Sequence, residues 1–349
     1  MSRETQEWLS NYTLIGLTDK RGQAWHWRKG DDNHFPGPIP VEVIRERLFF
    51  WEPDTGTVES NVVTNDGVYQ VTAPGRKKII RPATPQLGPA AILGEFNLDT
   101  PMHSYDEWLI GNVETILHDG LVVGSAGLLK SGAQAWVQVE LPDTVKTPEG
   151  VEFSPYLTAA TSLDGSLATT YKRGNNVVVC DNTLHAALKS DTMRIRVKHT
   201  KNSATQTRIQ GVRDALNIVH TEAEDFAREI RELCATEVSN RQWRAFLDAY
   251  TPLPEQKLTK GGGPGSGYTR TENKRDKLTA MYLQDYRVTD WTGTAFGVLQ
   301  AVNTYNMHET SVRGDLHRVE RNMINDIKDK IRDEDVRVLD TLNRVLVSS

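Results

Sequence analysis

The strongest constraint on the fold is a change in hydrophobic period between residues 121 and 179. Short apolar segments such as Ala135–Val139 and Tyr156–Ala160 alternate there with turn-forming residues, for example Asp164-Gly165 and Gly174-Asn175. A period of two with regular turns is typical of β-strands. Returns this short require antiparallel pairing, because parallel neighbours need a crossover of a dozen or more residues. We therefore predict an antiparallel meander of four or five strands.

Helical patterns flank the meander on its N-terminal side. Pro40 opens a short apolar-periodic segment, and Pro is tolerated where the first helical N–H has no partner. Ser104 and Glu107 form a capping box, which predicts an amphipathic helix over Ser104–His118. Between them, Thr64–Gly67 has the composition of a turn that enters an alternating strand.

The last third of the chain has a helical pattern throughout. Ser203 and Gln206 form a second capping pattern, and we expect a long helix from there to about Val238. Further helices are predicted over Ser239–Tyr250, Gly293–Met307 and Asp315–Leu346. Val177–Leu184 is interpreted as a buried strand that leads into a helix capped by Asp181 or Asn182.

These patterns predict an α+β protein: an antiparallel β-meander with a following strand and long helix, then a helical C-terminal module. We divide the chain into an N-terminal mixed α/β segment (1–120), a central sheet with its long helix (121–250), a flexible Gly-rich linker (251–267) and the helical module (268–349). A chain of 349 residues is long enough for such an arrangement.

Composition excludes several classes of protein. No run of about 18 apolar residues is present and the first ten residues are polar, which argues against a membrane span or a secretory signal, so we expect no membrane partner and a cytoplasmic location. The two cysteines, Cys180 and Cys234, lack the paired spacing of a zinc site or disulfide framework. The nine histidines are scattered singly. We predict neither a metal nor a cofactor.

The charge of the chain is unevenly distributed. Nine Lys or Arg residues lie between Lys172 and Arg213 against two acids, although the whole chain carries a formal charge of −5. In the predicted strand Met193–Lys198, alternation places Arg194, Arg196 and Lys198 on one face. These cations would be spaced about 7 Å apart along the strand. Such a row can neutralise successive phosphates and release their counterions.

We therefore predict that basic residues of this segment contact nucleic acid. Trp136, Tyr156 and Tyr171 lie in or beside the meander, and stacking of bases on such rings would favour single-stranded DNA. Two alternatives remain: intramolecular salt bridges over an exposed sheet face, and an anionic ligand or acidic protein partner. The predicted nucleic-acid-binding residues are Lys172, Arg173, Arg194, Arg196, Lys198, Lys201 and Arg208.

No sequence motif indicates catalysis. The Gly261–Gly267 segment lacks the Lys of a phosphate-binding loop in register. Neither a Gly-x-Ser-x-Gly elbow nor a His-Glu-x-x-His helix occurs. We assign no catalytic residue and do not expect an enzyme. A hydrolase site assembled from the dispersed residues Asp164, Asn182 and His199 is a further alternative.

The run VVVCDNTLHAAL at Val177–Leu188, with Arg194-Ile195-Arg196 and Lys198-His199-Thr200 after it, resembles the phage/plasmid-like protein family that carries the domain of unknown function 932. Further matches are Thr161–Ser166 and the segment Gly293–His308. The resemblance departs at Leu163-Asp164-Gly165, where the family often has His-Asp-Gly.

The resemblance implies a mobile-element context in a bacterial host cell. Together with the cationic strand and the absence of an ATP site, it leads us to expect a phage- or plasmid-encoded accessory protein. Such a protein would bind or anneal single-stranded DNA in replication or recombination and would form homo-oligomers. The alternative is a host-takeover or anti-defence protein that binds a host protein through the acidic helical third.

Overall fold

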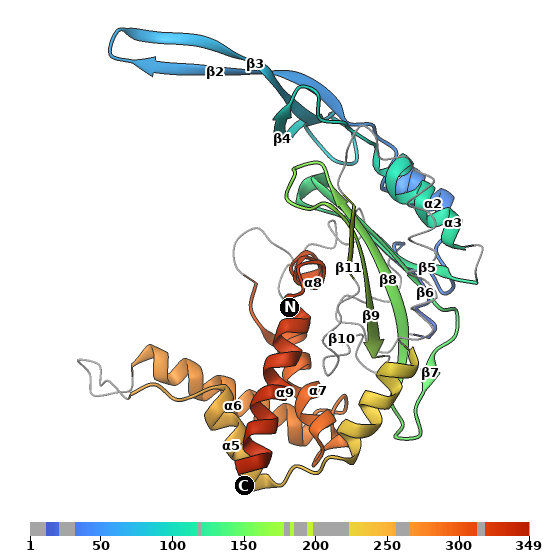
Figure 1. The fold of residues 1–349 in the computed structure, drawn as a ribbon, viewed down its shortest axis with the longest axis vertical. Helices are drawn as coiled ribbons and strands as arrows, with labels where there is room; N and C mark the ends of the chain where they lie inside the picture. Colours follow the sequence, from blue (N-terminus) through green and yellow to red (C-terminus); the bar gives the residue numbers. More distant parts are fainter. Residues whose placement is uncertain are drawn as a thin grey trace.

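The computed structural model describes residues 12–20, 32–117, 120–177, 182–184, 194–197, 223–255, 265–312 and 318–348. A curved antiparallel sheet forms the centre, a small sheet with a long hairpin extends from one end, and helices pack at the other end (Figure 1). The arrangement confirms the predicted α+β class.

The central sheet has eight strands in the order β1-β5-β6-β8-β9-β10, with β7 paired to β8 and β11 paired to β9. In chain order the strands are β1 Thr13–Ile15, β5 Val122–Leu129, β6 Gln134–Glu140, β7 Val145–Lys146, β8 Glu152–Ser162, β9 Thr169–Val177, β10 Asn182–Leu184 and β11 Arg194–Val197. Neighbours β5, β6, β8 and β9 are joined in sequence order, as the meander prediction required.

One face of the central sheet packs against two short helical segments. Val137 lies opposite Ala126 on β5 and Ala159 on β8, and Ala159 lies opposite Tyr171 on β9. These four side chains are buried in one cluster with apolar residues of both segments. The first segment is α2 (Val41–Arg47), and the second is a π-helical turn (Asp106–Ile110) that continues directly into α3 (Gly111–Leu117). Each fully buried Leu or Ile of this cluster contributes about 1.5–3 kcal/mol relative to exposure.

An ion-pair group joins the two helical segments on this face. Arg45 of α2 lies 2.7 Å from Asp106 and 2.8 Å from Glu114, measured between guanidinium nitrogen and carboxylate oxygen. The pKa of Arg45 is raised by hydrogen bonds to Glu114 and Asp106. The two segments are therefore linked by charge as well as by the shared core.

The C-terminal helices build a second core around the far end of the sheet. Phe153 of β8 and Val177 of β9 are buried there with Phe226, Phe246 and Phe296 from three helices. The helices are residues 223–235, α5 Asn240–Tyr250, α6 Ser266–Gln284, a 3-10 turn Thr289–Trp291, α7 Ala295–Thr304 with a π-helical turn Tyr305–Glu309, α8 Arg318–Ile327 and α9 Lys330–Ser348. None of the helices in the described part of the chain is long and apolar enough to cross a membrane.

A separate three-stranded sheet carries the long hairpin. It consists of β2 Asp54–Thr64, β3 Gly67–Arg81 and β4 Ala91–Asn97 in that order. Thr64 pairs with Gly67, so Asn65 and Asp66 form the two-residue turn that the sequence predicted. β4 pairs with β3 only from Arg76 to Arg81, which leaves the rest of the hairpin two-stranded (Figure 1).

Several expectations need correction at the level of single elements. Asn182–Leu184 is a strand paired with β9 and not the start of a helix, because its backbone continues the sheet ladder. The helix predicted from Ser104 begins as a π-helical turn, although Ser104 Oγ does accept a hydrogen bond from the Glu107 N–H at 3.1 Å. Helices α8 and α9 are separated at Asp329, whose φ of 63° ends the first helix.

Other expectations are confirmed or lie outside the described residues. The helix after Pro40 forms, and α5 begins at a capping box in which Ser239 and Gln242 bond reciprocally. The start of the long helix at Ser203, the strand residues Val178 and Val179 and most of the Gly-rich linker lie outside the described residues.

Candidate functional site

Among the predicted nucleic-acid contacts that the structure describes, Lys172 is buried. Its Nζ lies 2.8 Å from Asp326 Oδ1 and 3.3 Å from Asp329 Oδ1, and the Lys172 and Asp326 side chains are only 6% and 5% exposed. Tyr156 donates a hydrogen bond to the other Asp326 oxygen at 3.3 Å. The expectation of an exposed phosphate contact is corrected for Lys172, because this charge anchors the end of α8 to the sheet.

The aromatic residues considered for base stacking are also interior. Trp136 and Tyr156 are 1% exposed, and Tyr171 is 3% exposed within the core shared with α2 and α3. Trp136 packs instead with Leu129, Ala160 and Ile327 of α8. None of these three rings is accessible to a base.

Arg194–Val197 of the predicted cationic strand form a strand at the edge of the sheet, whereas Met193 and Lys198 lie outside the described residues. Arg194 lies opposite Lys172 and Arg196 opposite Thr170 in the ladder between β11 and β9. Among the described strands β11 pairs only with β9, and β10 continues the same edge further along. Arg173 is half-buried on β9, opposite Leu157 of β8. Lys198, Lys201 and Arg208 lie outside the described residues.

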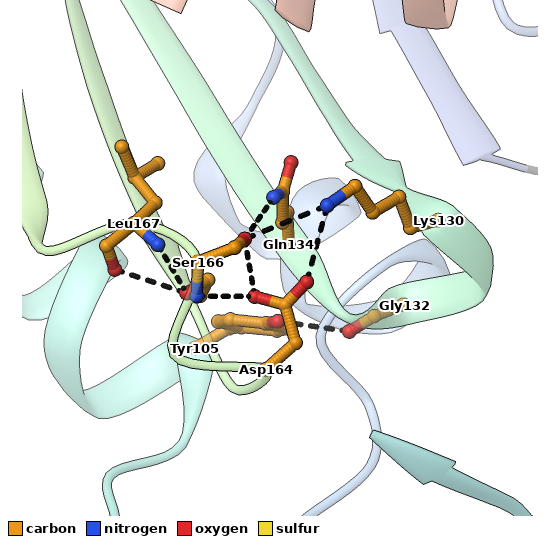
Figure 2. Close-up of polar contacts among 8 residues, drawn as sticks. Tyr105, Lys130, Gly132, Gln134, Asp164, Ser166 and Leu167 are labelled. Atoms are coloured by element: carbon orange, nitrogen blue, oxygen red, sulfur yellow. Dashed lines mark hydrogen bonds and ion pairs between the residues drawn. The ribbon is translucent and has the colours of Figure 1, made fainter. Parts of the chain in front are cut away.

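A polar cluster lies at the end of the sheet where β11 finishes. Val197 is opposite Thr169, the first residue of β9, so β11 ends beside the turn between β8 and β9. We call Lys130, Gln134, Asp164 and Ser166 the turn cluster (Figure 2). Two antiparallel turns, β5–β6 and β8–β9, supply its members and lie at the same end of the sheet.

The turn cluster is closely hydrogen-bonded. Lys130 Nζ lies 3.2 Å from Asp164 Oδ2, and the hydroxyl and N–H of Ser166 both donate to Asp164 Oδ1, at 2.5 and 2.9 Å. Gln134 Nε2 donates to Ser166 Oγ at 2.5 Å. Figure 2 shows the Lys130, Gln134 and Ser166 polar atoms converging around the carboxylate. The β5–β6 turn is thus fastened to the β8–β9 turn.

The pKa of Asp164 reflects these contacts. Burial alone would raise the pKa, but the hydrogen bonds from Ser166 and the attraction of Lys130 together lower it below its ordinary value. Asp164 is therefore an ionised carboxylate at neutral pH.

The backbone that presents Lys130 adopts an uncommon conformation. Lys130 and Ser131 have φ values of 50° and 55°, and Gly132 follows at 93°. Left-handed non-Gly residues cost of order 1–3 kcal/mol each and persist only where the surroundings hold them. Tyr105 supplies one such restraint, because its buried hydroxyl donates to the Gly132 carbonyl at 2.8 Å (Figure 2). Burial raises the pKa of Tyr105 well above its ordinary value, which keeps this hydroxyl a donor.

An apolar pocket of about 220 Å³ lies beside the β8–β9 turn, where the small sheet meets the central sheet. Phe96, Met102, Leu163 and Leu167 supply its apolar walls, and His103 lines its rim. The His103 ring stacks on Trp108 with centroids 4.5 Å apart, and its Nδ1 lies 3.7 Å from a Glu107 oxygen. Ile79, at the base of the hairpin, also lines the pocket. We therefore call it the base pocket, a name that refers to the hairpin and not to a nucleobase.

The chemistry available in this region favours binding over catalysis. The Lys130 ammonium is held by the Asp164 carboxylate, and the Ser166 hydroxyl donates to that same carboxylate. The lowered pKa of Asp164 makes it a weak general base for a serine, so Ser166 is poorly activated as a nucleophile. No group of three or more metal-ligating side chains occurs among the described residues. His199 of the dispersed hydrolase alternative lies outside the described residues.

Sequence reasoning did not identify the turn cluster. A signal for it was present in the meander, because alternate turns of an antiparallel meander lie at the same end of the sheet. The segments that carried the family resemblance also meet in space: β10, which includes Asn182 and Thr183, contacts α7 and α9. Helices α7 and α9 also contact each other, and buried Asn303 of α7 donates to Asp335 of α9 at 3.1 Å.

Comparison with known proteins agrees with this grouping. Residues 106–327 match the family model described as domain of unknown function (DUF932), which covers more than half of the chain and includes the sheet from β5 to β11, the turn cluster and α7. No curated protein and no solved structure matches the chain. The chain therefore belongs to the family defined by the domain of unknown function DUF932.

Proposed function

We propose that this protein binds nucleic acid along the sheet edge formed by β11, as an accessory factor that binds or anneals single strands in a phage or plasmid context. The observation that carries the proposal is the position of Arg194–Val197 as an edge strand on β9. An extended strand whose sequence alternates Arg with apolar residues offers a linear row of cations, which suits one phosphate backbone.

The surroundings of this edge support the proposal in two ways. β11 runs toward the turn cluster, where Lys130 is about a third exposed. In the sequence, Lys198 and Lys201 follow β11. Annealing needs no nucleotide hydrolysis, because base pairing supplies the free energy. Burial of Trp136, Tyr156 and Tyr171 removes the stacking argument, so the preference for single strands rests on the linear geometry of the row alone.

The test is a salt titration of oligonucleotide binding, followed by fluorescence anisotropy, for the wild type and Arg194→Ala/Arg196→Ala. We expect affinity to fall as salt rises, and the double substitution to reduce the logarithmic salt slope by about 1.4 for single strands, that is about 0.7 per lost phosphate contact. Matched single- and double-stranded oligonucleotides report the preference.

Arg241→Ala/Arg244→Ala is the matched control, because it removes the same charge from two exposed positions of α5. Figure 1 shows α5 near the C-terminal end of the chain, away from β11 in the central sheet. The control should keep the wild-type slope. Binding that is insensitive to salt, or an equal loss in both double variants, would contradict the proposal.

A further inference from the structure

The two-stranded part of the hairpin is exposed on every side. We call residues Glu59–Thr72 the arm tip; the ladder there runs from the pair Glu59–Thr72 to the pair Thr64–Gly67. Every residue from 59 to 72 is exposed, including Val63 at 78%, Val68 at 67% and Tyr69 at 51%. Neither outer edge of the arm tip pairs with another of the described strands. An isolated two-stranded hairpin is marginally stable in water.

The exposed apolar side chains are ordered by the ladder. Val62 lies directly opposite Tyr69, and Val71 is two residues further along the same face. Val63 and Val68 form the opposite pair on the other face. Apolar side chains grouped in this way on a surface mark an interaction site. The arm tip therefore has the features of a docking element.

The charges of the arm indicate what kind of partner it can take. The arm tip contains the acids Glu59 and Asp66 and no Lys or Arg, so it has nothing to attract phosphates or an anionic membrane. The sign reverses at the base of the arm, where Arg76, Lys77 and Lys78 follow one another. A protein surface with an apolar recess and basic surroundings complements the arm tip.

The chain itself carries such a surface, at the base of the arm. The base pocket has a volume suited to one or two side chains and apolar walls from Phe96, Met102, Leu163 and Leu167. The Lys77 ammonium lies at its margin, donating to the carbonyl of the pocket residue Thr100 at 2.6 Å. The base pocket and its surroundings are therefore complementary to the arm tip in both polarity and charge.

The arm tip cannot enter the base pocket of its own chain. Ile79 lines the pocket and is ten residues from Tyr69 along β3, a span of about 33 Å at 3.3 Å per residue. Figure 1 shows the hairpin directed away from the central sheet, with its base beside that sheet and its turn at the far end. Any arm tip in the pocket must come from another copy.

We propose that the arm tip of one copy docks its Val62, Tyr69 and Val71 face into the base pocket of a second copy, with Glu59 and Asp66 near the basic run Arg76–Lys78 of that copy. The two surfaces differ, so the contact is head-to-tail and generates a ring or an open chain. This inference goes beyond the proposed function, because it does not depend on nucleic-acid binding.

The test measures the mass of the full chain by light scattering across a concentration series without nucleic acid. We expect concentration-dependent assembly of the wild type, and at least tenfold weaker self-association for Tyr69→Ser/Val71→Ser. Leu253→Ser/Leu283→Ser is the matched control, because both residues are exposed and apolar but lie outside the arm. It should assemble like the wild type. Thermal melts establish that each variant is folded.

A mixing experiment tests the head-to-tail geometry directly. Met102→Glu places a charge in the base pocket that repels the acidic arm tip, and this variant alone should also self-associate at least tenfold more weakly than the wild type. Mixed with the arm-tip variant, it should form a complex of one copy of each, because one intact tip and one intact pocket remain.

A wild type that stays monomeric at every concentration would overturn the proposal. Assembly of the arm-tip variant to the wild-type mass would also overturn it. A mixture that yields no paired complex would reject the base pocket as the acceptor. If the protein is a monomer and its arm tip is needed to bind a different protein, then a second copy is not the partner of the arm tip.

Discussion

Lys172 of β9 and Asp326 of α8 form a buried ion pair, with Nζ and Oδ1 2.8 Å apart across a separation of 154 residues in sequence. It joins the central sheet to the C-terminal helices at a position where both charges are removed from water. A buried pair of this kind is worth little relative to an apolar pair, but removing one partner leaves an uncompensated charge.

The first prediction concerns this pair. Lys172→Met should lower the free energy of unfolding by about 3–5 kcal/mol, because Asp326 and Asp329 would then face each other without their cation. Urea denaturation monitored by tryptophan fluorescence measures the change. Lys146→Met breaks the exposed pair with Glu152 and should cost no more than about 1 kcal/mol. Equal effects of the two substitutions would contradict the structural role of Lys172.

The second prediction is a pH dependence at Asp164. Its folded pKa lies below the ordinary value, so ionised Asp164 stabilises the fold at pH values above the ordinary carboxyl pKa of about 3.9. Asp164→Asn should therefore reduce stability at neutral pH, by about 1–2 kcal/mol for the lost charge-assisted hydrogen bonds. The difference between wild type and variant should remain constant from pH 7 to about 5 and shrink as the pH falls below about 4.

Denaturation curves of both proteins between pH 3 and 7 make this measurement, with Asp248→Asn as the control for a mostly exposed carboxylate. A difference that grew on acidification would have the wrong sign for a carboxylate with a lowered pKa.

Features of the fold that depend on neighbouring residues could be predicted from the sequence, whereas features that depend on residues far apart in the chain could not. The meander, the Asn65-Asp66 turn and α5 follow from local period, turn residues and capping, and the structure confirms them. The burial of Lys172 could not be derived in the same way, because it depends on Asp326, which is remote in sequence. Alternation separates the faces of a strand but does not tell which face a helix will cover.

Helix α6 and the turn cluster were also difficult to predict, because the local sequence of each carries little information about its tertiary contacts. α6 spans Ser266–Gln284 but buries only Leu278, Met281 and Tyr282, all near its end, so its sequence lacks a continuous apolar stripe. The turn cluster joins two segments that each have the composition of an ordinary turn, Lys130–Gly132 and Asp164–Ser166. Only the topology brings them together.

The third prediction concerns the reactivity of Cys234. Burial and the nearby Glu149 raise the pKa of this thiol to about 12, which leaves little thiolate at pH 8. Alkylation by iodoacetamide should be slower than in the denatured chain by on the order of a hundredfold, because the higher nucleophilicity of a basic thiolate offsets part of its scarcity. Peptide-resolved mass spectrometry follows Cys234 separately from Cys180. Equal rates in native and denatured protein would contradict the raised pKa.

The fourth prediction concerns backbone strain beside the turn cluster. Ser131 is held at φ 55° and ψ 35°, a left-handed conformation that disfavours a side chain but suits glycine. Ser131→Gly should therefore stabilise the protein by about 1 kcal/mol, less the entropy that glycine gains in the unfolded state. Gly132→Ala should act in the opposite direction, because Gly132 has φ 93° and an added Cβ would lie 3.0 Å from the Arg81 side chain. Thermal unfolding of the two variants measures these effects. Opposite shifts in Tm are expected if the backbone of the turn is strained at both positions. A lower Tm for Ser131→Gly would show that the serine side chain stabilises the fold by more than its left-handed conformation costs.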